Sequence, residues 1–229
     1  MLQFFQSSLG KKYVMAVSGF CLFGFVIVHM VGNLQIFLGP EPLNRYAHFL
    51  QSMPELLWPA RIGLLTLVGL HLWSAVKLSA VNKAARPTGY AGNPTPISAS
   101  YASRTMLMSG LIVAAFIGYH LLHFTIRIPA VNLTGQDFKT LLDPQTKHPD
   151  VFRMMVVGYS SGWVSGFYIL AMGLLCLHLS HGVSAMFQSV GLRNEQSEKW
   201  IDRAARAAAA IIFIGNSSIP IAVLLGYGR

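Results

Sequence analysis

The sequence predicts an all-α integral membrane bundle of five transmembrane helices, formed by a single domain that covers residues 1–229. Of these residues 53% are hydrophobic and only 11% are charged, whereas a soluble domain carries about 25% charged residues. Apolar stretches of about the 20 residues that cross a bilayer recur five times. The net charge of +9 comes from basic residues at the ends of these stretches. This placement is typical of topology determinants, and it argues against nucleic-acid binding.

The expected spans differ in how clearly their ends are marked. The first is free of charge for far longer than the roughly 7–15 residues of a signal-peptide core, so we expect it to be retained. The fourth lies in an uncharged run, 154–192, that is too long for one crossing, so one end must either extend beyond the hydrocarbon or begin as a loop near residues 158–162. No internal repeat is evident. The expected spans cover residues 13–38, 58–81, 105–126, 160–190 and 207–227.

The distribution of basic residues predicts the orientation. With the N-terminus in the cytoplasm, ten of the 17 lysines and arginines lie at the inner ends of the spans and seven at the outer ends. Short loops rich in Lys and Arg stay inside. We therefore expect a multi-pass protein of the inner (cytoplasmic) membrane with its N-terminus cytoplasmic and its C-terminus outside.

Six of the eight histidines lie inside the apolar stretches. Such residues in a membrane are costly and mark functional sites by default. Haem b suits them, because it brings four equatorial nitrogens and asks the protein only for axial ligands. No Cys-x-x-Cys-His motif is present, so a haem would be bound non-covalently. The six are His29, His71, His120, His123, His178 and His181.

The depth of the histidines groups them into two pairs. His29 lies 17 residues after Lys12 and His120 lies 16 after Arg104, so both reach a similar height in the outer half. The other two are counted inward from the outer aromatic belt. His71 lies 13 residues after Trp58. His178 lies 15 residues after Trp163, so the heights of these two histidines also match, in the inner half. We expect two haems b, bound by His29 with His120 and by His71 with His178.

His123 and His181 are the competing ligands. Each follows its neighbour by three residues on roughly the same helix face, and using either would worsen the height match by about 4.5 Å. They remain alternative ligands or hydrogen-bonding neighbours of the haems. Two-histidine sites without a cysteine or carboxylate are poor closed zinc sites, so a bare metal ion is disfavoured.

Several motifs together resemble a known family. The chain is similar over nearly its whole length to the dihaem cytochrome b subunit of bacterial succinate dehydrogenase/fumarate reductase, in the complex II family. The motifs occur in the family's order on the expected spans and in the first outer loop, at residues 8–12, 15–19, 29–34, 44–50, 69–71, 118–124 and 177–182.

This resemblance implies a membrane anchor that carries electrons between a partner iron–sulfur subunit and membrane quinone. The partners would be a flavoprotein with FAD and an iron–sulfur subunit docked on the inner face, where basic residues of the loops 3–12, 83–104 and 193–206 lie. The family's four axial ligands map onto His29, His71, His120 and His178. The chain itself has no residues for succinate chemistry, which the flavoprotein would perform.

Two further groups of residues are candidates for binding. Basic side chains near the span ends can pair with haem propionates: Arg45, Arg61, Lys77 and Arg104. A quinone headgroup needs hydrogen-bonding groups near a membrane surface, and we favour the outer surface. Some relatives have an acidic residue after the His-Phe pair of the first outer loop, where this chain has Gln51. The candidates are His48, Gln51, Glu55 and Asn33 outside, or Lys11 and Tyr13 inside.

Two alternative functions stay open at this point. The chain could be the cytochrome b subunit of another quinone-linked dehydrogenase, of the hydrogenase or formate dehydrogenase type. It could also be a membrane transporter without haem, whose histidines relay protons or join helices.

Overall fold

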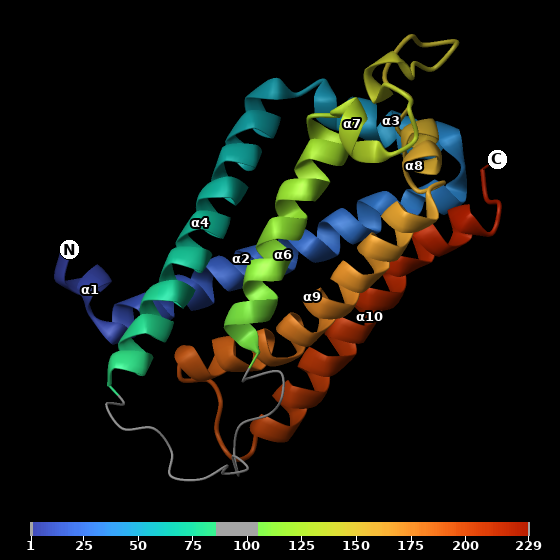
Figure 1. The fold of residues 1–229 in the computed structure, drawn as a ribbon. Helices are drawn as coiled ribbons and strands as arrows, with labels where there is room; N and C mark the ends of the chain where they lie inside the picture. Colours follow the sequence, from blue (N-terminus) through green and yellow to red (C-terminus); the bar gives the residue numbers. More distant parts are fainter. Residues whose placement is uncertain (1, 86–104, 229) are drawn as a thin grey trace.

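The computed structural model describes residues 2–85 and 105–228, and within them it confirms the predicted all-α bundle (Figure 1). Five helices are long and apolar enough to cross a membrane, which makes this a multi-pass membrane protein. They are α2 (Ser8–Leu34, extended by the 3₁₀ turn η1, Gln35–Leu38), α4 (Pro54–Ala84), α6 (Met106–His120, extended by the π-helical turn η2, Leu121–Thr125), α9 (Gly162–Ser189) and α10 (Glu198–Leu224).

The helices extend beyond several of the expected ends. The largest difference is at α10, which begins at Glu198 rather than at residue 207. Its first turns contain Lys199, Asp202 and Arg203, so an apolar window leaves them out. Backbone hydrogen bonding needs no apolar side chains, and the helix therefore continues past the hydrophobic segment. Of the two alternatives for the fourth span, the loop near residues 158–162 is present, because α8 (Val151–Gly158) ends before α9 begins.

The loops that the orientation prediction places outside form short helices that gather at one end of the bundle, which we call the outer end. Figure 1 shows α3 (Pro40–Gln51), α7 (Pro129–Asn132) and α8 together at the top, near the C-terminus, with the N-terminal helix α1 (Leu2–Gln6) far from them. The sequence predicted only a loop where α3 lies. Gly39 allows the change of direction before α3, because its φ of 101° lies in a region that side chains disfavour.

A pair of polar contacts joins α3 to α8. The Asn44 side chain donates to Asp150 Oδ1 over 3.0 Å and accepts from the backbone N–H of Phe152 over 2.9 Å. Asp150 also accepts from the backbone N–H of Arg153, and it thereby caps the start of α8. The C-terminal Tyr227 donates to the backbone carbonyl of Ile36 over 2.9 Å. These contacts hold the outer cap together.

The fifth helix packs along the fourth, as Figure 1 shows for α10 and α9. Small residues on α10 allow the two backbones to approach, and Ala205 and Ala209 are each 1% exposed. The other spans are much less buried, and α4 buries only Ser74 and Leu78 of its 31 residues. The protein core therefore lies between α9, α10 and the outer cap, and it includes Phe116 of α6.

We expect Asn44→Ala to destabilise the outer cap. The change removes both hydrogen bonds of this side chain and leaves partly buried groups without partners, which costs about 1–3 kcal/mol. Thermal unfolding of the protein in detergent measures the effect. Gln51→Ala, at an exposed position on the same helix, is the control and should leave the midpoint unchanged. Equal midpoints for Asn44→Ala and wild type would show that this contact does not hold the cap.

Candidate functional site

The structure brings the predicted outer pair together. The imidazole rings of His29, on α2, and His120, on α6, have centroids 5.6 Å apart and planes at 87°. Phe25 stacks on His29 one turn earlier, with centroids 5.2 Å apart. Two histidines that are 91 positions apart in the chain therefore meet, one from each helix.

The predicted inner pair is also adjacent. The rings of His71, on α4, and His178, on α9, have centroids 6.3 Å apart and planes at 67°. The four histidines therefore come from four different spans and form two separate pairs, as the height argument predicted.

Both spacings fit two axial ligands of one metal. A metal binds an imidazole nitrogen at about 2.0 Å, and this nitrogen lies about 1.1 Å from its ring centre, so two opposed axial imidazoles have centroids about 6 Å apart. The observed distances, 5.6 and 6.3 Å, lie on either side of this value. The ring separations therefore fit two imidazole ligands of one metal at each pair.

Hydrogen bonds leave the other ring nitrogen free for such a ligand. The Nδ1 of His71 lies 3.2 Å from both the Ser18 hydroxyl and the backbone carbonyl of Met15. A carbonyl oxygen can only accept, so Nδ1 carries the proton and Nε2 keeps its lone pair. In His178 the Nδ1 lies 3.3 Å from the Ser109 hydroxyl, and this ring also bonds to the backbone of Met106. A neutral imidazole in this tautomer is the form that binds a metal through Nε2.

His123 lies within the π-helical turn η2, three residues after His120. Its Nδ1 and that of His120 both contact the hydroxyl of Tyr168, which agrees with the expectation that the two residues lie on roughly the same face. His123 is fully buried against Phe124, with ring centroids 4.0 Å apart.

Tyr168 connects His123 with the outer pair. Its hydroxyl lies 2.9 Å from Nδ1 of His123 and 3.4 Å from Nδ1 of His120. His123 is therefore a neighbour of the proposed ligand through one hydroxyl group. Tyr159, just before the fourth span, closes this cluster, and its burial raises the pKa of the phenol so that it stays protonated.

His181 is the other alternative ligand, and it lies toward the inner end of α9. It is half-buried and is within electrostatic range of Arg193 and Asp202, which form a salt bridge of 3.2 Å. Neither His123 nor His181 forms a ring pair with a histidine of another span in the described residues. In the same residues no three His, Cys, Asp or Glu side chains gather as a closed metal site would require.

The candidate propionate partners differ in their surroundings. Arg45 is exposed and pairs with Glu41 over 3.6 Å, and Arg61 lies 5.3 Å above the Trp58 ring. Lys77 is exposed on α4, and Arg104 lies outside the described residues. The structure brings none of the three described residues into contact with a histidine of the pairs.

The outer quinone candidates lie around the start of α4 and the end of α3. His48 stacks on His148 of the polar loop, with ring centroids 3.8 Å apart, while Gln51 and Glu55 are exposed. Asn33 is half-buried near the end of α2. These residues do lie at the end of the bundle to which His29 and His120 are nearer.

The inner quinone candidates have local structural partners. Lys11 is 8% exposed, and its amino group donates to the backbone carbonyls of Gln6 and Ser7. It thereby closes the turn between α1 and α2. Tyr13 is exposed and stacks on Phe4 of α1. This arrangement accounts for Lys11 without a quinone.

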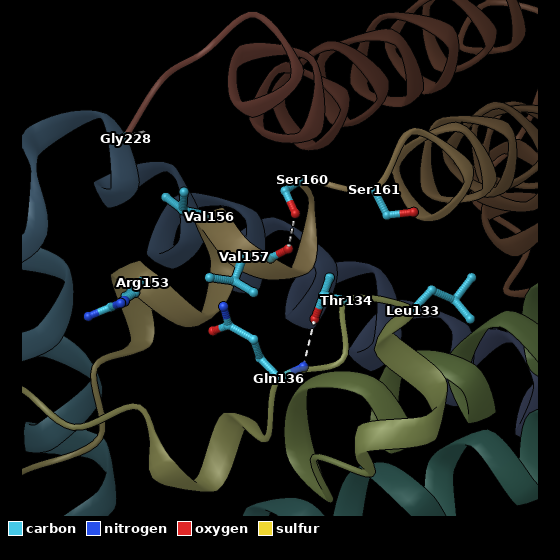
Figure 2. A pocket seen from close by; sticks show the side chains of 9 residues that line it. All are labelled: Leu133, Thr134, Gln136, Arg153, Val156, Val157, Ser160, Ser161 and Gly228. Carbon is cyan, nitrogen blue, oxygen red and sulfur yellow. Dashed lines mark hydrogen bonds between the residues drawn. The ribbon is translucent and has the colours of Figure 1, made fainter.

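A surface groove of about 570 Å³ lies in the outer cap, away from both histidine pairs. Figure 2 shows Gln136 and Arg153 on one side of it and the serines of the α8–α9 turn on another. None of the predicted site residues lines it. A second groove, of about 390 Å³ and almost wholly apolar, lies near the inner end between Phe23, Phe187 and Trp200.

Sequence reasoning missed the residues that hold the histidines. The sequence pattern gave no role to Ser18, Ser109 or Tyr168. Their signal was weak, since serine and tyrosine are ordinary residues in membrane helices. Comparisons with protein-family models, with curated proteins and with solved structures find no match for this chain.

We expect Tyr168→Phe to destabilise the outer cluster. The change leaves Nδ1 of the fully buried His123 without its hydroxyl partner, which costs about 1–3 kcal/mol. The thermal midpoint in detergent should fall, whereas Tyr13→Phe, at an exposed phenol, should not change it. A midpoint for Tyr168→Phe at the wild-type value would mean that His123 finds another partner.

Proposed function

We propose that this chain is the membrane-anchor and electron-transfer subunit of a succinate:quinone oxidoreductase, in which two bis-histidine haems b connect a partner iron–sulfur subunit with membrane quinone. The observation that carries the proposal is the formation of two imidazole pairs by four spans, with centroids 5.6 and 6.3 Å apart. Helix contact alone does not require four histidines to meet two by two.

The residues of the chain supply what a bound haem needs from its protein. His71 and His178 keep Nε2 available because Nδ1 is occupied by a hydroxyl and a carbonyl. The bound haems would supply one-electron transfer. The apolar spans exclude water from the imidazoles and keep them neutral, as an axial ligand must be.

The proposed partners follow from the resemblance of the motifs and from charge. A flavoprotein with FAD would oxidise succinate, and an iron–sulfur subunit would dock at the end of the bundle that contains the N-terminus. We place this end on the cytoplasmic side of the inner membrane, because Lys11, Lys12 and the basic start of α10 lie there. Residues 86–104, which belong to the proposed docking face, lie outside the described residues.

We expect the purified complex to contain two non-covalent, low-spin haems b for each copy of this chain. His71→Ala or His178→Ala should remove the inner haem and keep the outer one, because each variant lacks one ligand of a single pair. His29→Ala or His120→Ala should do the reverse. Pyridine haemochrome assays and reduced-minus-oxidised spectra measure both results. One haem or none in the wild-type complex would contradict the proposal.

Neighbouring histidines on the same helices provide matched controls. His123→Ala and His181→Ala should retain both haems, because neither ring meets a histidine of another span. Loss of a haem in one of these variants, together with its retention in His120→Ala or His178→Ala, would exchange the assignments.

We also expect quinone to react at the outer surface. Glu55→Gln and His48→Ala should keep both haems and slow quinone-linked turnover at least several-fold, because they change polar groups at that surface. Succinate oxidation by an artificial acceptor, which bypasses the membrane subunit, should keep its wild-type rate in both variants.

Glu41→Gln, at another exposed carboxylate of the outer surface, is the control for this measurement. Wild-type quinone reduction in both variants, with its loss in variants of Lys11 or Tyr13, would place the quinone at the inner surface instead.

A further inference from the structure

A fifteen-residue pattern occurs twice in the chain, although the sequence analysis found no repeat. Residues 15–29 and 106–120 share Met-x-x-Ser-Gly-x₅-Phe-x₃-His, so that five of fifteen positions are identical. The two copies are Met15, Ser18, Gly19, Phe25 and His29, and Met106, Ser109, Gly110, Phe116 and His120. An apolar membrane helix requires neither a serine nor a histidine at fixed positions, so composition alone does not account for the match.

The repeated serines make the same contact. Ser18 lies 3.2 Å from Nδ1 of His71, and Ser109 lies 3.3 Å from Nδ1 of His178. Each serine hydroxyl donates its own proton to a backbone carbonyl one turn earlier in its helix, and each oxygen therefore accepts from the imidazole.

The methionines of the pattern also match. The backbone of Met15 bonds to His71 and that of Met106 bonds to His178. Each imidazole thus has one hydroxyl and one main-chain partner at the same two positions of the pattern.

The repeated glycines lie against the same ring atom. A Cβ added at Gly19 would be 3.2 Å from Cε1 of His71, and one added at Gly110 would be 3.2 Å from Cε1 of His178. A side chain at either position would push the imidazole away from its present place. The equality of these distances in two separate helix pairs is a second, independent sign of equivalence.

The repeated aromatic residues precede the outer histidines. Phe25 lies 5.2 Å from His29 and Phe116 lies 6.1 Å from His120, centroid to centroid. The spacing from serine to histidine is eleven residues in both copies, which selects His120 rather than His123 as the equivalent of His29.

The contacts define two equivalent helix pairs. In the first, α2 holds the histidine of α4, and in the second, α6 holds the histidine of α9. Each proposed metal centre then joins a residue to its own equivalent, His29 to His120 and His71 to His178. Parallel repeats of this kind are related by an axis along the membrane normal. That axis would pass through both centres, and α10 lies outside the repeat.

We propose that α2–α4 and α6–α9 are two copies of one structural unit, and that Ser18 and Ser109 are its equivalent positioning residues, which orient the two inner imidazoles toward a shared haem. This inference rests on the proposed function. The serines act through the histidines, since each accepts the Nδ1 proton. An acceptor at this position gives the imidazole more anionic character, which favours the oxidised metal.

Redox titration of the intact complex tests the proposal. Ser18→Ala and Ser109→Ala should each raise the midpoint potential of the inner haem, by similar amounts, and leave that of the outer haem unchanged. The control is Ser217→Ala, a buried serine on α10 with a hydroxyl that has no hydrogen bond among the described residues. It should shift neither haem.

The outcomes separate this inference from the proposed function. A wild-type complex without haem overturns the proposed function. If wild type has two haems, any of three results overturns the positioning role alone. These results are no shift of the midpoint potential in the serine variants, a shift in only one of them, and an equal shift in Ser217→Ala. Loss of the inner haem with retention of the outer one supports it. Where an alanine variant loses both haems, Ser18→Cys or Ser109→Cys, similar in size but a weak acceptor, replaces it in the same titration.

Discussion

The hydrogen bond from an imidazole Nδ1 to the facing helix is the interaction on which the arrangement of the spans depends. An uncharged histidine in hydrocarbon still has one donor and one acceptor, and a donor without a partner is costly there. His71 and His178 solve this by donating to a serine and a main-chain carbonyl of the neighbouring helix. The contact fixes the register of α2 against α4 and of α6 against α9. It also decides which ring nitrogen is free, so the structural and the proposed chemical roles have one cause.

The outer half of the bundle departs from the equivalence of the two helix pairs. His120 has Tyr168 near its Nδ1, and Tyr168 lies ten residues before His178 on α9. The equivalent position on α4, ten residues before His71, is Arg61. His123, within the π-helical turn that follows His120, packs in an aromatic cluster with Phe124. Two similar pairs of ligands would therefore have different surroundings. Such surroundings are among the factors that set the potential of a bound haem.

The charged residues of the described chain lie at the two ends of the bundle and are mostly occupied locally. Arg193 joins the α9–α10 connection to Glu198 and Asp202, and the Asp202 carboxylate also accepts from Ser184 over 2.5 Å. At the other end, Asn44 and Asp150 tie the outer helices together. The long spans between these ends have few polar contacts besides those of the histidines. The histidine contacts are therefore the main polar contacts between the spans.

The sequence by itself determined the all-α class, the five spans and the two pairs of histidines, because membrane thickness and helical rise turn residue counts into heights. It did not determine α3 or the early start of α10, since amphipathic helices outside the hydrocarbon lack an apolar signal. The tertiary structure decided the contacts of His123, Ser18, Ser109 and Tyr168. A height says how deep a side chain lies, whereas its partner depends on the rotation of each helix about its axis. That rotation is set by packing between residues that are 45 to 69 positions apart.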